Sequence, residues 1–99
     1  MKKYPISVEG FDGTLEELAQ CIGGMCYDKV VEFLYLLKRE ISRQAEGDRG
    51  SGRMKLHLLL VRAVGQIVIL MSVFQDMVDG PCKKYIEAEK ELEKDNESN

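Results

Sequence analysis

The sequence has few of the residues on which most enzymes and metal sites depend. Among 99 residues it has no tryptophan, one histidine and three cysteines. His57 is the one imidazole that could activate a cysteine nucleophile, but it precedes a run of leucines, and Cys21 and Cys26 belong to other predicted helices. No Glu-x-x-His pair occurs, and the cysteines lack the close pairing of zinc ligands. We therefore predict that the chain is not an enzyme and has no catalytic residue, metal or cofactor.

The small, odd number of cysteines also bears on the cellular compartment. Cys21, Cys26 and Cys82 have no regular spacing, and residues 1–5 do not lead into the apolar segment of a secretory signal. Disulfides are rare in the reducing cytosol. We therefore expect a cytoplasmic protein in which each cysteine is a small apolar core residue.

Neither a strong charge nor a disordered composition is present. The formal net charge is −3, and 44% of the residues are hydrophobic while 31% are charged, as in globular proteins. The length corresponds to one domain. We assign residues 1–13 to an extended N-terminal arm, residues 14–94 to a single helical domain and residues 95–99 to a frayed C-terminal tail.

The first predicted helix has a clear beginning and end. Thr14 and Glu17 have the spacing of a capping box, in which each side chain bonds the backbone of the other residue. The apolar residues that follow repeat at three- and four-residue steps, as on one face of a helix, until Gly23 and Gly24 end it. The expected helix is therefore short.

Two long helices and one short helix follow. An amphipathic pattern predicts a second helix over about 25–44, and glycines at 47, 50 and 52 predict a connection over 45–52. The third helix is expected over about 53–79, where Gly80 and Pro81 end it and a fourth begins. The sequence thus predicts an all-α fold, a helical bundle of three to four helices in the order short, long, long, short.

The third predicted helix is apolar on every side, since residues 58–61 and 67–71 are consecutive apolar runs. Such a helix is buried either in protein or in lipid. We expect the other helices to cover about two-thirds of its circumference. The remainder would be covered by another chain, most simply a second copy across a two-fold axis. The predicted association surface consists of Leu59, Val64, Ile67, Val68, Leu70, Met71 and Phe74.

These patterns favour a non-enzymatic helical protein–protein interaction module, a homodimer that also meets an unidentified protein partner. One alternative is a membrane-associated protein that inserts the third helix. Against it, the apolar stretch over 58–74 has only 17 residues and contains Arg62 and Gln66, whereas a span needs about 20 apolar residues.

The other alternative is a nucleic-acid-associated protein. The segment 38–62 is basic, and antiparallel helices would gather five of its charges at one end of the hairpin. Phosphate contacts need positive charge but few sequence-specific groups. The same charges could instead offset the dipole at a helix C-terminus. The candidate anion contacts are Arg39, Arg43, Arg49, Arg53 and Lys55.

Overall fold

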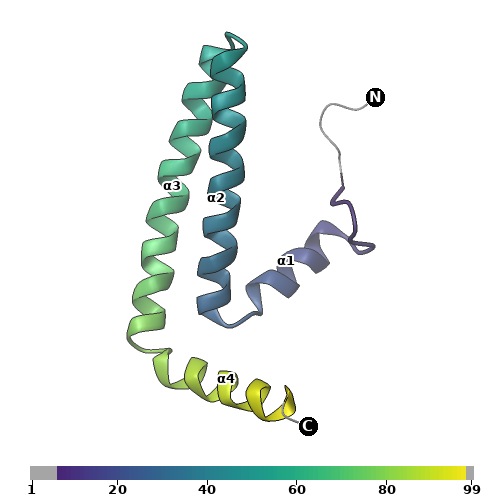
Figure 1. Ribbon diagram of the computed structural model, residues 1–99, viewed down its shortest axis with the longest axis vertical. Coiled ribbons are helices and arrows are strands. Elements are labelled where there is room, and N and C mark those ends of the chain that lie inside the picture. The colour runs from purple at the N-terminus through teal and green to yellow at the C-terminus, as the bar shows by residue number, and fades with distance from the viewer. Residues whose placement is uncertain (1–6, 98–99) are drawn as a thin grey trace.

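The computed structural model describes residues 7–97, which form four helices and no strand (Figure 1). The predicted all-α class is confirmed, as is the order of short, long, long and short helices. Their bounds are α1 Leu15–Gly23, α2 Tyr27–Gly50, α3 Met54–Asp79 and α4 Lys83–Glu97.

The centre of the fold is an antiparallel hairpin of α2 and α3, which lie side by side along their length (Figure 1). From α2, Val30, Leu34 and Ala45 are buried in the seam between the two helices. At one end of the seam, the rings of Tyr27 and Phe74 meet edge to face, with centroids 5.5 Å apart. Apolar steps of three and four residues place these side chains on one face of each helix.

The end of α2 differs from the expectation for residues 45–52. The helix continues to Gly50, and only residues 51–53 connect it to α3. Asp48 is buried, and its Oδ1 accepts a hydrogen bond from Arg53 Nε at 2.7 Å. The carbonyl oxygen of Ala45 lies 2.7 Å from Nδ1 of His57 on α3. These contacts offset the unfavourable helix propensity of the glycines, about 1 kcal/mol each. Gly52, at φ +80°, supplies the left-handed turn residue.

The first helix begins as its sequence predicts. The backbone N–H of Glu17 donates to Thr14 Oγ1, and the backbone N–H of Thr14 donates to the Glu17 carboxylate, which completes the capping box. The helix leaves the hairpin at Gly24, does not run along it (Figure 1) and contains no buried residue. Residues 7–13, the described part of the predicted arm, have no helix or strand. Residues 1–6 lie outside the described residues.

The fourth helix packs across the end of the hairpin rather than along it (Figure 1). Ile86 is its buried residue, and Lys90 Nζ lies 2.7 Å from Asp28 Oδ2 on α2. The helix extends to Glu97, two residues beyond the start of the predicted tail at 95. The domain boundaries at 13/14 and 94/95 stay predictions.

The ion pair between Asp28 and Lys90 makes the position of α4 sensitive to acid. The hydrogen bond from Lys90 lowers the pKa of Asp28 below its ordinary value of 3.8. A lowered carboxyl pKa contributes stability above the unfolded pKa, and that stability is lost as the pH falls through the folded value. We therefore expect α4 to loosen below about pH 4, whereas the hairpin persists.

An NMR titration of the Ile86 methyl groups would measure this change. In Lys90→Gln the acid step should disappear or move toward higher pH, because the partner that lowers the Asp28 pKa is gone. An unchanged acid step in Lys90→Gln would contradict the assignment to this pair.

Candidate functional site

The most unusual surface of the molecule is the apolar exterior of α3. None of the residues in α3, all of which the structure describes, is buried. The expectation that the other helices cover two-thirds of its circumference is wrong, because α1 turns away from the hairpin at Gly24, α4 packs only across its end, and only α2 lies along α3. The exposed large apolar residues of α3 are Met54, Leu56, Leu58, Leu59, Val61, Val68, Ile69, Leu70 and Val73.

The chain as a whole also exposes more surface, and is more extended, than a compact monomer of its mass. A compact monomer of 11.2 kDa exposes about 5,700 Å² of surface and has a radius of gyration of about 13 Å. This chain exposes 8142 Å² and has a radius of gyration of 17.1 Å. The chain therefore exposes roughly 2,400 Å² more surface than a compact monomer of its mass.

A seven-residue repeat organises the side chains of α3. The residues that face α2 recur at alternating steps of three and four and are all half-buried. We call this set the first stripe. Its members are His57, Leu60, Val64, Ile67, Met71, Phe74 and Val78.

A second set repeats with the same steps, displaced by one residue toward the N-terminus. One residue turns the helix by about 100°, so this set flanks the first stripe. Leu59, Leu70 and Val73 are 54%, 45% and 52% exposed, whereas Ala63 and Met77 are half-buried. We call the set the second stripe, and it consists of Leu56, Leu59, Ala63, Gln66, Leu70, Val73 and Met77.

The adjoining side of α2 extends this apolar surface at two positions, whereas Lys29 and Gln44, which precede the buried Val30 and Ala45, make the rest of that side polar. Phe33 immediately precedes the buried Leu34, just as Leu70 immediately precedes Met71, and in antiparallel helices such positions lie on the same side of the seam. Leu37 is 38% exposed beside them. Six of the seven residues in the second stripe are apolar.

The opposite flank of the seam is more polar. Here a shallow groove between α2 and α3 is lined by Lys38, Val68, Ser72 and Gln75, among others. The outermost line of α3, farthest from α2, also recurs every seven residues and consists of Lys55, Arg62, Ile69 and Asp76.

The seven residues predicted for association are thus distributed over three faces. Val64, Ile67, Met71 and Phe74 belong to the first stripe and face α2. Leu59 and Leu70 belong to the second stripe, whereas Val68 lines the polar flank.

Sequence reasoning missed five members of the second stripe, which are Leu56, Ala63, Gln66, Val73 and Met77. The seven-residue spacing of the charged positions 55, 62 and 76 is the signal that could have assigned the faces.

The five predicted anion contacts lie around the turn between α2 and α3, but three of them have carboxylate partners. Arg43 bonds Glu40, Arg49 Nη1 lies 3.7 Å from Glu46 Oε2, and Arg53 bonds Asp48. Among residues 7–97, no ion pair is formed by the other two contacts, Arg39 and Lys55.

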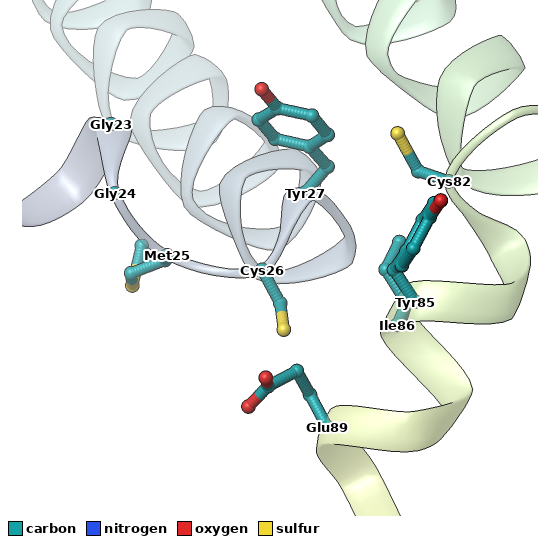
Figure 2. Close-up of a pocket in the computed structure, with 9 residues that line it drawn as sticks. All are labelled: Gly23, Gly24, Met25, Cys26, Tyr27, Cys82, Tyr85, Ile86 and Glu89. Atoms are coloured by element: carbon teal, nitrogen blue, oxygen red, sulfur yellow. The ribbon is translucent and has the colours of Figure 1, made fainter.

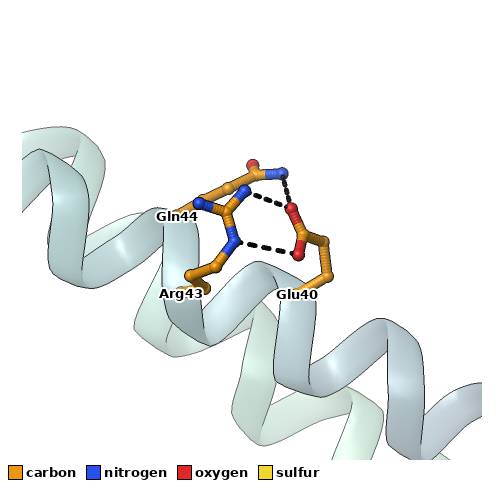
Figure 3. Close-up of polar contacts among 3 residues, drawn as sticks. All are labelled: Glu40, Arg43 and Gln44. Atoms are coloured by element: carbon orange, nitrogen blue, oxygen red, sulfur yellow. Dashed lines mark hydrogen bonds and ion pairs between the residues drawn. The ribbon is translucent and has the colours of Figure 1, made fainter.

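Figure 3 shows Arg43 and Gln44 both donating to the carboxylate of Glu40. These hydrogen bonds lower the pKa of Glu40 to about 2, with Arg43 as the larger cause. Glu40 is therefore charged at neutral pH and offsets Arg43, which weakens this end of the hairpin as an anion site.

A pocket in the angle between α2 and α4 contains two of the cysteines. Cys26 and Cys82 line it with Tyr27, Tyr85 and Glu89 (Figure 2). Both cysteines are half-buried, whereas Cys21 on α1 is exposed, so the expectation of a core position is wrong for Cys21. Its helix turns away from the hairpin and has no core to enter.

Within residues 7–97, no group of three or more histidine, cysteine or acidic side chains is placed to hold a metal ion. Nδ1 of His57 is engaged with the carbonyl of Ala45 in the hairpin end.

By length and composition, α3 could cross a membrane. A single helix of this kind is weak evidence, since the core helix of a soluble protein has the same length and composition, although such a helix is mostly buried and α3 has no buried residue. The choice between lipid and protein as the cover of α3 therefore has to be made from the side chains of the rest of the hairpin.

No protein family, curated protein or solved structure matches this chain.

Proposed function

We propose that this chain is a non-enzymatic helical interaction module that associates with a second copy of itself through the apolar surface of α3. The proposal rests on the observation that α3 has no buried residue although α2 packs along its whole length. Soluble monomers seldom expose one contiguous apolar patch larger than a few hundred Å². A four-helix bundle of two hairpins would remove this surface from water.

The size of the exposed surface suits such a dimer. Stable interfaces bury about 800 Å² on each partner, and obligate dimers bury more. The chain exposes roughly 2,400 Å² beyond a compact monomer. Part of the excess belongs to α1 and α4, so a dimer of obligate type needs only a fraction of it.

A membrane-inserted α3 is the second candidate, because its length and composition suffice for a span. The packing of α2 argues against it. A spanning α3 in this hairpin would carry the charged outer side chains of α2, among them Glu32, Arg39 and Glu40, into the hydrocarbon. Each charge at the bilayer centre costs about 2.5–3.5 kcal/mol on the insertion scale. Insertion would therefore require the hairpin to open.

The mass of the purified, detergent-free protein tests the proposal. Size-exclusion chromatography with light scattering should give twice the chain mass of 11.2 kDa at micromolar concentration.

A monodisperse monomer in detergent-free buffer would contradict the proposal. Recovery only in the presence of detergent, with partition into the detergent phase, would favour membrane insertion instead. A dimer would leave the outer surfaces, including the turn with Arg39 and Lys55, free for a second partner.

A further inference from the structure

We infer that the second copy docks antiparallel on the second stripe of α3, with the two-fold axis passing close to Gln66. This inference rests on the proposed self-association and names the face, the orientation and the residue at the centre. It distinguishes the second stripe from the more polar flank and from the outermost line of α3.

The first argument is the composition of the three faces that α2 leaves uncovered. The second stripe has one polar residue, Gln66, near the middle of the helix. The opposite flank has the exposed Leu58, Val61 and Val68, but also Gly65, Ser72 and Gln75. The outermost line has charged residues at three of its four positions. The second stripe and the adjoining Phe33 and Leu37 of α2 thus form the most continuous apolar surface. Burial of this surface releases the most apolar area from water.

The second argument is geometric. Helices of a four-helix bundle have two contact faces, one for each neighbour, and the first and second stripes are about 100° apart. The first stripe already packs on α2. The second stripe has the same alternation of three- and four-residue steps, which is the pattern for packing on another helix.

The third argument is self-complementarity. If two copies of the stripe are antiparallel, Leu56 can face Val73 of the other copy, and Leu59 can face Leu70. In the same register Ala63 faces Gln66, so the longest central side chain meets the smallest. A two-fold interface requires this reciprocity, because each residue pair occurs twice.

Gln66 then has a defined role at the centre. In this register the two copies of Gln66 are separated by only about 5 Å along the helix axis. One amide N–H can donate to the carbonyl oxygen of the other, which satisfies polar groups that burial would otherwise leave unpaired. A single buried amide in an apolar seam favours one register over its alternatives.

The area is sufficient for this docking mode. The 26 residues of α3 extend about 39 Å, and a pair of helices is about 20 Å wide. The face of the hairpin is therefore near the 800 Å² that a stable dimer buries on each partner.

Cross-linking of single-cysteine chains tests the face and the orientation together. The background is the full chain with its three cysteines replaced, as Cys21→Ser, Cys26→Ser and Cys82→Ser. Each of three variants of this background then carries one added thiol, from Gln66→Cys, Leu59→Cys or Ile69→Cys. A short bis-maleimide joins two thiols only when they lie close together. The copies of position 66 are within its reach, whereas those of position 59 are about 17 Å apart along the axis.

We expect covalent dimers in good yield from Gln66→Cys and little or none from the other two variants. Equal yields from Gln66→Cys and Leu59→Cys would indicate a parallel arrangement and overturn the inference. Cross-linking of Ile69→Cys alone would assign the dimer to the outer line of α3. In both cases light scattering would still give a dimer, so the inference would fail while the proposed function stands.

Substitution of Leu70 by lysine provides a second measurement that does not depend on cross-linking. Leu70→Lys should weaken the dimer about tenfold or more in Kd, because it removes a buried leucine and places a charge in the interface. Ile69→Lys, one residue along the same helix, should leave Kd nearly unchanged. Equal effects of the two substitutions would overturn the choice of face. A monomeric parent chain would remove both the inference and the proposed function.

Discussion

Leu34→Ala is expected to lower the free energy of unfolding by about 2–4 kcal/mol. Leu34 is 9% exposed and is the largest of the buried apolar side chains that α2 contributes to the seam with α3. Its truncation removes apolar contacts and leaves a cavity that two stiff helices cannot close. In so small a seam the loss is a large part of the total stability.

Urea unfolding followed by far-UV circular dichroism would measure this loss. Protein concentration must be held constant, since the stability of a dimer depends on it. Leu36→Ala is the matched control, because Leu36 lies two residues away and is 44% exposed. Its cost should be about 1 kcal/mol or less. Equal costs at the two positions would mean that the α2–α3 seam is not the core of the protein.

Asp48→Asn should lower the free energy of unfolding by about 1–3 kcal/mol. Asp48 is the buried acidic residue of α2, and its carboxylate accepts a hydrogen bond from Arg53 at the hairpin turn. The amide keeps the shape of the side chain but removes its charge. The charge-assisted bond to Arg53 is thereby lost. Because the side chain of Arg53 is 45% exposed, the expected loss is smaller than the 3–5 kcal/mol typical of a fully buried pair.

The control for this substitution is Glu46→Gln in the same helical turn. Glu46 and Arg49 form an exposed pair at 3.7 Å, and such pairs contribute about 0–1 kcal/mol. Thermal unfolding of both variants would compare the two sites directly. A loss in Glu46→Gln as large as that in Asp48→Asn would contradict a specific role for the buried carboxylate.

Local signals in the sequence determined most of the secondary structure. The capping box of Thr14 and Glu17 marks the start of α1 because its hydrogen bonds join residues three apart. Gly80 ends α3 because the chain turns there, and Pro81 cannot continue the same helix. The alternation of apolar and polar residues predicted α2, because burial on one side of a helix leaves a period in the sequence. In contrast, α3 was predicted from its continuous apolar runs between the glycine-rich segment and Gly80.

The end of α2 depended on contacts that local propensity does not contain. Gly47 and Gly50 favour a loop in isolation, yet the helix includes both. Asp48 and Ala45 are buried against the start of α3, where Arg53 and His57 bond them. Tertiary packing therefore outweighed helix propensity at this point.

The sequence by itself determined that α3 has more apolar surface than one neighbouring helix can cover. The charged positions 55, 62 and 76 mark one line of the helix, but the apolar residues on its other sides do not show by themselves which of them meet α2. Only the packing of the hairpin assigned Val64, Ile67, Met71 and Phe74 to the α2 seam and left the stripe around Gln66 uncovered. Likewise, only the tertiary structure decided that α1 turns away from the hairpin and that α4 packs only across its end. The physical reason is that periodicity shows how much surface a helix must bury, whereas the neighbour that buries it depends on the path of the connecting turns.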